Sequence, residues 1–334
     1  MKIFLNQVSF KKQNNYVKKV SVLIPIYNQE KYLAKALDSL LNQTFKDFEV
    51  ICVNDGSKDN SLKILKEYAS KDSRIKVIDQ KNQGIGRTRN TALKNANGEY
   101  IAFLDPDDTF EKNALECLYT QAKEQDCDFL AFNYKKVDTQ GNVIDHVSIK
   151  ENLKYIYNIN SDKLFTWKDI KQKVFGGLYT ASWNKIYKHD FIKDNKIHFT
   201  KSNLGEDQVF VYGATLMAKK IGYSDNYYYN YLIHPKSALR TVSDKNLCIF
   251  QAMDAIKNLI KNLNLTEDLK KEYEKYIIRG VLRHERLIKS KDKYEQLYKR
   301  RLSGEQLKIL NREKQTIPKL YQILDSIKLK KIKV

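Results

Sequence analysis

The sequence predicts an open, doubly wound α/β sheet with a helical C-terminal extension. Short β-branched apolar runs recur between residues 20 and 104, stretches with helical periodicity separate them, and from residue 244 onward the pattern is helical almost throughout. Three successive alternations of strand and helix are typical of a parallel sheet with helices on both faces. A chain of 334 residues has room for one such domain and a smaller second unit.

Four apolar runs are the predicted strands, and they lie at residues 20–26, 48–53, 75–78 and 100–104. One-sided apolar stripes predict helices between the first three, at residues 31–41 and 60–69. Further along, the sequence predicts a helix over residues 113–125, a strand over 129–133 and a hairpin that turns at 139–142.

The C-terminal helices are expected to break near Asn264, Gly304 and Pro318. The changes of pattern along the chain divide it into an N-terminal leader, a main domain and a basic helical region, at residues 1–18, 19–240 and 241–334.

Charge is the strongest signal in the composition. The 60 basic and 40 acidic residues give a net charge of +20, and residues 240–334 hold 24 of the basic and 12 of the acidic ones. Such a field attracts polyanions, so nucleic acid, an anionic membrane surface and phosphate-bearing substrates are all candidate partners. Only the net charge favours nucleic acid as a partner, since the sequence shows no basic patch with interleaved aromatic residues on which bases could stack. We therefore expect no nucleic-acid partner.

The cysteines are scattered without metal-ligand spacing, which predicts free thiols in a reducing compartment rather than disulfides or a zinc site. No apolar stretch approaches the length that spans a bilayer, and residues 1–19 lack the apolar centre of a signal peptide. The expected location is therefore cytoplasmic. The cationic amphipathic end at residues 328–333 fits a peripheral position on the inner face of the cytoplasmic membrane, and it fits a solvated charged face equally well.

Polar segments follow each predicted strand, at the edge of an open α/β sheet where ligands bind. These segments are residues 25–30, 54–59, 82–90 and 105–108. Taken alone, each has a structural interpretation, as a turn, a helix cap or an incomplete glycine fingerprint. However, the three carboxylates within residues 105–108 repel one another unless a cation or hydrogen-bond donors lie among them. Mg²⁺ or Mn²⁺ bound by one or two carboxylates and completed by diphosphate oxygens satisfies this need, which favours a nucleotide diphosphate as ligand.

Together these segments resemble family 2 of the glycosyltransferases, inverting enzymes with the GT-A fold. The resemblance is nearly continuous from Lys19 to Asp108 and weaker through residues 182–187, 205–207 and 228–237. It rests on Pro25-x-Tyr27-Asn28, residues 37–44, Val53-Asn54-Asp55-Gly56-Ser57-x-Asp59, Asn82-x-Gly84-x-Gly86-x-x-Arg89-Asn90 and Phe103-Leu104-Asp105-Pro106-Asp107-Asp108. It implies a Rossmann-like nucleotide-sugar-binding half (19–108) and an acceptor half (109–240). The sequence has no Gln-x-x-Arg-Trp motif, so a non-processive enzyme fits better than a polysaccharide synthase.

The resemblance implies a pocket for the nucleotide base. Asp55 would hydrogen-bond the base, Pro25 and Tyr27 would line the same pocket, and Asn28 and Asn82 would lie nearby.

The diphosphate and the metal would lie beside this pocket. The resemblance implies that Arg89 supports the donor diphosphate, that Asp105 faces the ribose or the metal, and that Asp107 binds the metal. His234 and Ser237 would belong to a loop that closes over the diphosphate.

An inverting transfer needs a carboxylate that accepts the proton of the acceptor hydroxyl. The resemblance assigns this role to Asp207, with Glu206 as its positional rival. Taken alone, an acidic pair that opens an apolar helix more often complements the helix dipole. Trp183, Asn184 and Lys185 would line the sugar site, although a position in the core is equally open for the tryptophan.

The predicted function is the transfer of one sugar from a nucleotide-sugar, taken as a UDP-sugar, to a hydroxyl of a glycan or lipid-linked acceptor, with Mn²⁺ or Mg²⁺. A role in cell-surface polysaccharide or lipooligosaccharide synthesis would follow. The alternatives are a polyanion-binding protein and a sugar-nucleotide-binding scaffold without activity. The sequence also leaves open a homo-oligomer formed through the C-terminal helices.

Overall fold

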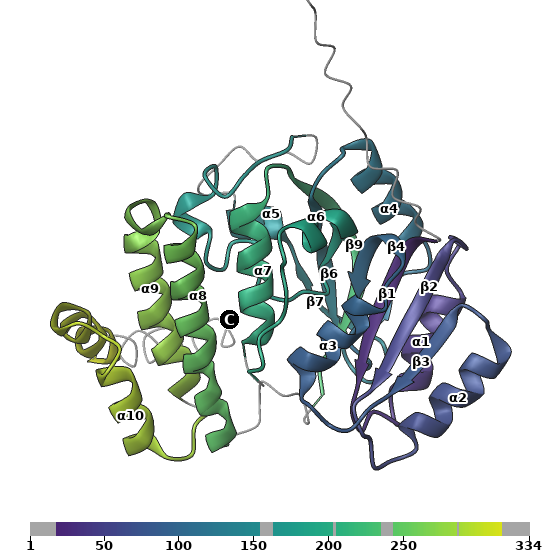
Figure 1. Ribbon diagram of the computed structural model, residues 1–334, viewed down its shortest axis with the longest axis horizontal. Helices are drawn as coiled ribbons and strands as arrows, with labels where there is room; N and C mark the ends of the chain where they lie inside the picture. Colours follow the sequence, from purple (N-terminus) through teal and green to yellow (C-terminus); the bar gives the residue numbers. More distant parts are fainter. Residues whose placement is uncertain (1–17, 154–162, 203–204, 235–242, 286, 316–334) are drawn as a thin grey trace, which may run out of the picture.

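The computed structural model describes residues 18–153, 163–202, 205–234, 243–285 and 287–315. Over these residues the chain forms a mixed nine-stranded sheet with helices on both faces and further helices stacked beside it (Figure 1). The strand order is β3-β2-β1-β4-β8-β6-β9-β5, with β7 paired to β6. The expected α/β class is therefore confirmed.

The first half of the sheet is parallel and contains the four predicted strands, each within two residues of its expected ends. They are β1 (Lys18–Ile26), β2 (Phe48–Asn54), β3 (Ile75–Asp79) and β4 (Gly98–Phe103). Strand β1 pairs with β2 on one side and with β4 on the other. Most of their residues are buried, because helices cover both faces of a parallel sheet.

The second half of the sheet is mixed. It contains β5 (Thr109–Phe110), β6 (Phe129–Val137), β7 (Val143–Val147), β8 (Lys185–Lys188) and β9 (Ile221–Leu232). Strand β8 lies antiparallel between β4 and β6, and β9 runs parallel to β6. The predicted hairpin is confirmed as β6–β7, in which Val137 is paired with Val143.

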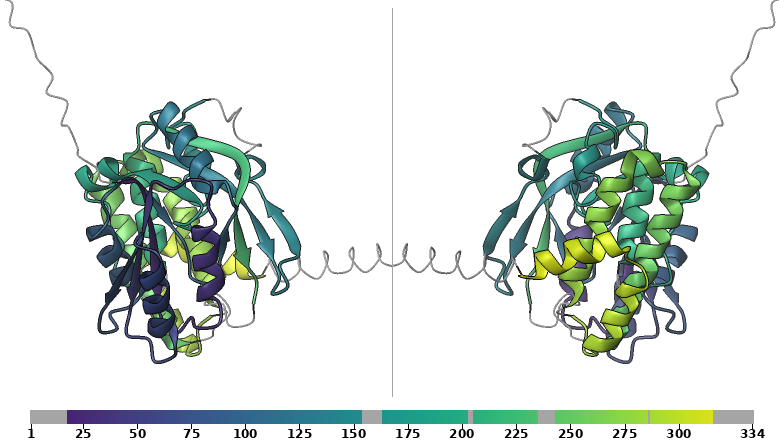
Figure 2. Two further views of the ribbon diagram at one scale, coloured as in Figure 1. Left: turned by 90° about the vertical axis from the view of Figure 1, so that its right-hand side faces the viewer. Right: turned by 90° about the vertical axis from the view of Figure 1, so that its left-hand side faces the viewer.

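Two sets of helices cover the sheet, as the views in Figures 1 and 2 show. On one face lie α1 (Leu33–Leu41), α2 (Ser61–Lys71) and α4 (Ala114–Glu124); on the other lie α3 (Ile85–Lys94), α6 (His189–Asp194) and α7 (Glu206–Met217). Residues three apart on β4 show the two sides, because Tyr100 contacts Tyr119 of α4 whereas Phe103 contacts Phe210 of α7. Short turns of helix are α5 (Ile149–Leu153), η1 (Lys171–Lys173) and η3 (Asp244–Cys248).

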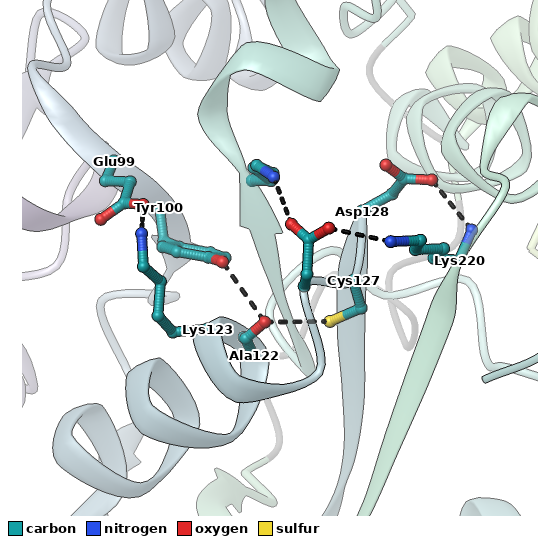
Figure 3. A network of polar contacts seen from close by, with 9 residues as sticks. Glu99, Tyr100, Ala122, Lys123, Cys127, Asp128 and Lys220 are labelled. Carbon is teal, nitrogen blue, oxygen red and sulfur yellow. Dashed lines mark hydrogen bonds and ion pairs between the residues drawn. The ribbon is translucent and has the colours of Figure 1, made fainter. Parts of the chain in front are cut away.

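A polar network joins the two halves of the sheet where α4 ends and β6 begins (Figure 3). The carbonyl of Ala122 accepts hydrogen bonds from the Tyr100 hydroxyl at 3.3 Å and from the Cys127 thiol at 3.7 Å. The carboxylate of Asp128 accepts the backbone N–H of Lys220 at 3.0 Å. These contacts tie α4 to β4 and the start of β6 to the start of β9.

The C-terminal helices stack on α7 (Figure 1). They are α8 (Ile249–Asn262), α9 (Thr266–Glu285) and α10 (Lys291–Lys299), followed by helical residues 304–315. The predicted break near Asn264 is confirmed, and this residue has a left-handed backbone with φ of 55°. The chain breaks again between α9 and α10, which the sequence pattern did not predict. Pro318 and residues 328–333 lie outside the described residues.

The C-terminal helices share a hydrophobic cluster with the main domain. Tyr212 and Leu216 of α7 pack there with Ile256 and Ile260 of α8. The domain boundary expected near residue 241 therefore separates helices with a common core, and the division into domains stays a prediction. The four cysteines are free thiols, as expected. Over the described ranges, no helix combines the length and apolar character that a membrane crossing requires.

Candidate active site

The site lies at the carboxyl ends of β1, β2 and β4, where the strand order reverses between β1 and β4. The segments after these strands are tied to β1. The N–H of Asp55, after β2, donates to the carbonyl of Ile26 at 2.8 Å, and the N–H of Leu104, after β4, donates to that of Leu23 at 3.0 Å. The predicted polar segments therefore meet at one edge of the sheet.

Asp55 holds the loop that leads into α3. Its carboxylate accepts the N–H groups of Gln83 and Gly84, both at 2.9 Å, and the side-chain amide of Gln80 at 2.7 Å. The side chain of Asn82 in turn donates to the Asp55 carbonyl at 2.9 Å. A carboxylate offers about four acceptor positions, so three of them are occupied within the protein. Recognition of a nucleotide base by Asp55 stays a prediction.

The loops after β1 and β2 are joined by reciprocal hydrogen bonds. The Asn28 N–H donates to the Ser57 hydroxyl at 3.0 Å, and its side-chain oxygen accepts the N–H of Lys58 at 2.8 Å. Pro25 lies within β1, paired with Val53, whereas the Tyr27 side chain is 45% exposed. Of the residues expected around the base, Tyr27, Asn28 and Asn82 are exposed, whereas Pro25 and Asp55 are buried.

Two glycines shape the first turn of α3. Gly84 caps the helix with a φ of 87°, which is a left-handed conformation that favours glycine. At Gly86 a Cβ atom would lie 1.9 Å from the carbonyl oxygen of Thr200, so only glycine lets this turn approach that backbone. Close packing therefore explains why Gly86 is a glycine, although Gly84-x-Gly86 lacks the third glycine of a dinucleotide fingerprint.

Arg89 binds two carboxylates from distant parts of the chain. Its Nη1 donates to Glu206 Oε1 at 2.6 Å, and its Nη2 donates to Asp105 Oδ1 at 2.8 Å. The guanidinium is 5.4 Å from the centre of the Phe199 ring. Burial alone would lower the pKa of Arg89, but the two carboxylates outweigh burial and raise it. The structure thus links the acidic segment after β4 to the first turn of α7.

Asp107, the expected metal ligand, lies beside His234, which was expected in a loop over the diphosphate. The Nε2 atom of His234 is 2.9 Å from Asp107 Oδ2, and the imidazole lies against the ring of Tyr32, with 4.9 Å between centroids. Burial and the neighbouring Asp105 charge raise the pKa of the Asp107 carboxyl. Ser237 lies outside the described residues.

Asp108 fixes the end of β9 against the acidic segment, a role that the sequence analysis missed. Its carboxylate accepts the Tyr229 hydroxyl at 2.8 Å and the Leu232 N–H at 2.7 Å. The same tyrosine hydroxyl accepts the N–H of Asp105 at 3.1 Å. Asp108 is 1% exposed, and burial raises its pKa well above the ordinary value. The third carboxylate of residues 105–108 was the one signal that could have pointed to this buried anchor.

The donor set around Asp107 fits a hard divalent cation. The His234 imidazole lies 2.9 Å from the Asp107 carboxylate, and burial and then the Asp105 charge raise the pKa of Asp107, so a cation would offset the unfavourable charged form. Within the described ranges, no three His, Cys, Asp or Glu side chains form a group that could hold a metal ion by themselves. A cation completed by diphosphate oxygens needs only one or two protein carboxylates.

The two acids that open α7 differ in their surroundings. Glu206 is 5% exposed and bound to Arg89, and burial raises its pKa despite that partner. Asp207 is partly exposed and accepts the N–H of Gln208 at 2.8 Å. Desolvation and then the Glu206 charge raise the pKa of Asp207 to about 7. A carboxylate with a pKa near the working pH is suited to accept and release protons.

The three residues expected at the sugar site are buried. Trp183 is 8% exposed and lies parallel to the rings of Tyr229 and Tyr231, at 4.4 and 5.5 Å between centroids. The Lys185 ammonium donates to the carbonyls of Tyr179 and Ala181 and to the Asn184 side chain, at 2.7–3.0 Å. These contacts satisfy all three of its N–H donors. The packing of Trp183 and of Lys185 with Asn184 is thus structural, and a contact of these residues with sugar stays a prediction.

The comparisons with known proteins give one consistent result. The model of a family described as "Glycosyl transferase family 2" matches residues 21–187. The chain is 33% identical over 273 residues to "Putative glycosyltransferase EpsH" of Bacillus subtilis, covering 78% of this chain and 74% of that protein. It is 35% identical over 257 residues to "Poly(ribitol-phosphate) beta-glucosyltransferase" of Bacillus spizizenii, covering 75% of this chain but only 38% of that protein.

A solved structure supports the same relationship. The crystal structure of residues 1–349 of TarS from Staphylococcus aureus, in complex with UDP-GlcNAc, matches with a TM-score of 0.62 and 29% identity. The match covers 80% of this chain and 72% of that one.

Proposed function

The chain belongs to glycosyl transferase family 2 and has the GT-A fold that its sequence predicts; from that premise we propose that this glycosyltransferase moves one sugar from a UDP-sugar to a hydroxyl of a cell-surface glycan or a lipid-linked acceptor. The observation that carries the proposal is Arg89, whose guanidinium holds the acidic segment after β4 and the first turn of α7 at one site. The UDP-GlcNAc complex of TarS supports uracil as the base, and the poly(ribitol-phosphate) relative supports a cell-surface polymer as the acceptor.

The donor would lie across the ends of β1, β2 and β4. The base would lie against the exposed Tyr27 ring, near the loop that Asp55 holds, and the diphosphate would extend toward Asp105 and Asp107. Asp107, with His234 beside it and Asp105 nearby, would hold a divalent cation, which would supply positive charge to offset that of the departing diphosphate.

Asp207 is the proposed general base. Its carboxylate would accept the proton of the acceptor hydroxyl as the oxygen bonds to the anomeric carbon and the bond from that carbon to the diphosphate breaks. The leaving diphosphate takes the bonding electron pair, and because the acceptor oxygen attacks from the opposite face, the configuration at the anomeric carbon inverts. Glu206 is unsuited to this role because its carboxylate is bound to Arg89.

Calorimetric titration with UDP and with GDP, with and without Mn²⁺, tests the donor site. We expect binding of UDP that depends on Mn²⁺ and that Asp107→Ala abolishes, whereas Glu305→Gln, at an exposed position far along the C-terminal helices, leaves it intact. Absence of nucleotide binding under all these conditions would refute the proposal.

Release of UDP from a panel of UDP-sugars then tests the base. Asp207→Asn should retain binding of UDP and lose most of its turnover, because the amide does not accept a proton at neutral pH. Glu206→Gln should retain measurable turnover, because its side-chain oxygen still accepts a hydrogen bond from Arg89. Unchanged turnover in Asp207→Asn would rule out this residue as the base.

A further inference from the structure

Strand β8 presents two polar side chains to the helix that carries the proposed base. Lys185 and Tyr187 are two positions apart, so their side chains lie on the same face of the strand. The Tyr187 ring packs edge-on against Phe210 of α7, with 5.2 Å between centroids. Because Phe210 follows Asp207 by three residues, about one helical turn, this face of β8 lies beneath the first turn of α7.

The hydroxyl of Tyr187 is buried and makes no hydrogen bond to any residue that the structure describes. The side chain is 0% exposed and is enclosed by the aromatic rings of Phe103, Phe129 and Phe210. Buried tyrosine hydroxyls usually find a partner, because an unpaired buried donor lowers stability. Such an orphaned group in a well-packed region is therefore expected to serve a function.

Two charges act on this hydroxyl, the Asp207 carboxylate and the Arg89 guanidinium. Arg89 has hydrogen-bond donors only, and it binds Glu206 and Asp105. Asp207 has acceptors, and the structure gives it one donor, the N–H of Gln208. Of these two charged groups, the Asp207 carboxylate is thus the one to which a tyrosine O–H can donate.

We propose that Tyr187 is a positioning residue for Asp207. Its hydroxyl donates a hydrogen bond to the Asp207 carboxylate through one bridging water and keeps that carboxylate ionised and turned toward the acceptor. The inference rests on the proposed function, in which Asp207 is the base.

Other groups around Asp207 also affect its ionisation. They come from its own helix and from each element packed against it, and comprise Glu206 and Tyr212 on α7, Arg89 on α3, Asp105 after β4, Lys185 and Tyr187 on β8, and Tyr276 on α9. The substitution Tyr187→Phe leaves all these other groups in place and removes a single oxygen atom.

The test measures the titration of Asp207 directly, by ¹³C NMR of the side-chain carboxyl carbons in the full chain, assigned through the missing signal of Asp207→Asn. In Tyr187→Phe we expect the pKa of Asp207 to rise by about one unit, which is tenfold in its ionisation constant. Turnover should then fall roughly eightfold at pH 6.5 and little at pH 9, because the base loses ionised fraction only on the acid side. KM for the donor should stay unchanged.

Tyr294→Phe is the matched control, because this buried tyrosine on α10 donates a hydrogen bond to the Val281 carbonyl at 2.8 Å. It should lose stability without a change in the pH profile, whereas Tyr187→Phe should be at least as stable as the unmodified protein. An unchanged Asp207 titration in Tyr187→Phe would overturn the inference, as would a loss of turnover that is equal at every pH.

The NMR titration needs no substrate, so it separates this inference from the proposed function. A shifted titration together with normal turnover in Asp207→Asn would refute the base assignment and leave the hydrogen bond standing. An unshifted titration together with an inactive Asp207→Asn would refute the hydrogen bond and leave the base assignment standing.

Discussion

Replacing Arg89 by methionine should destabilise the protein by an amount that depends on pH. The Arg89 side chain is 4% exposed, and the side chains of its partners Glu206 and Asp105 are 7% and 23% exposed. Removing the guanidinium leaves the Glu206 carboxylate buried without a cation, and breaking a buried ion pair typically costs about 3–5 kcal/mol. Asp105 contributes less to this loss because water reaches it.

The loss of unfolding free energy in Arg89→Met has an upper limit, because the buried Glu206 carboxylate can take up a proton instead of staying charged. From its ordinary pKa of 4.5, taking up a proton at pH 7.5 costs about 4 kcal/mol, since each unit is about 1.4 kcal/mol. At pH 5.5 the same step costs only about 1.4 kcal/mol. In the variant the folded protein holds this proton and the unfolded chain releases it above pH 4.5, so the destabilisation should grow as pH rises from about 5.5 to 7.5.

Urea denaturation at pH 5.5, 6.5 and 7.5, followed by circular dichroism, measures the difference. The matched control is Arg301→Met, because Arg301 also binds a carboxylate at 2.8 Å, that of Asp254, but these side chains are 30% and 48% exposed. An exposed pair is worth about 0–1 kcal/mol, so the control should show a small loss.

The double variant Arg89→Met/Glu206→Gln should recover much of the stability lost in Arg89→Met, because the uncompensated charge is then absent. A loss below about 1 kcal/mol in Arg89→Met at pH 7.5, or one that does not change with pH, would contradict a buried ion pair at this position.

Three further predictions follow from the same geometry. Asp207→Asn should stabilise the protein at pH 8 by at most about 4 kcal/mol and much less near pH 4, because a folded pKa of about 7 makes the ionised native carboxylate unfavourable. Urea denaturation at the two pH values measures this stabilisation, and equal stabilisation at both would contradict the prediction. Asp108→Ala should leave the buried Tyr229 hydroxyl and Leu232 N–H unpaired, which costs about 1–3 kcal/mol of stability for each group. It should also weaken Mn²⁺-dependent binding of UDP in calorimetry, and unchanged stability would contradict the anchoring role of Asp108. Gly86→Ala should lower the thermal midpoint because its Cβ meets the Thr200 carbonyl, whereas Gly304→Ala, with open space around it, should not; equal midpoints would contradict the close approach.

The local pattern of the sequence was sufficient to predict the parallel half of the sheet. Strands buried on both faces are continuous apolar runs, so β1, β2 and β4 stand out without any knowledge of their partners, whereas the edge strand β3 has one buried residue. The sequence also indicated the edge where ligands bind, because polar residues follow each run. Periodicity did not predict that β8 lies antiparallel between β4 and β6, since the choice of partner depends on contacts remote in sequence.

The candidate site was predicted in its residue types but not in its contacts. Arg89 and Glu206 are 117 positions apart, and no pattern along the chain announces their ion pair. The sequence predicts Lys185 at the sugar site, which stays a prediction, but it gave no sign that the ammonium binds the carbonyls of Tyr179 and Ala181 and the Asn184 side chain. A charged side chain is exposed by default, so its burial is visible only when the three acceptors are in place.

The different surroundings of Glu206 and Asp207 follow from helix geometry. Consecutive residues on an α-helix point about 100° apart, so a contact that fixes the direction of one also fixes the direction of the other. The bond between Arg89 and Glu206 sets the rotation of the first turn of α7 and thereby the direction of Asp207. Because the same guanidinium binds Asp105, the acidic segment after β4 and the proposed base are oriented by one side chain. Glu206 therefore acts on Asp207 in two ways, by holding the helix in place and by raising the pKa of its neighbour through like charge.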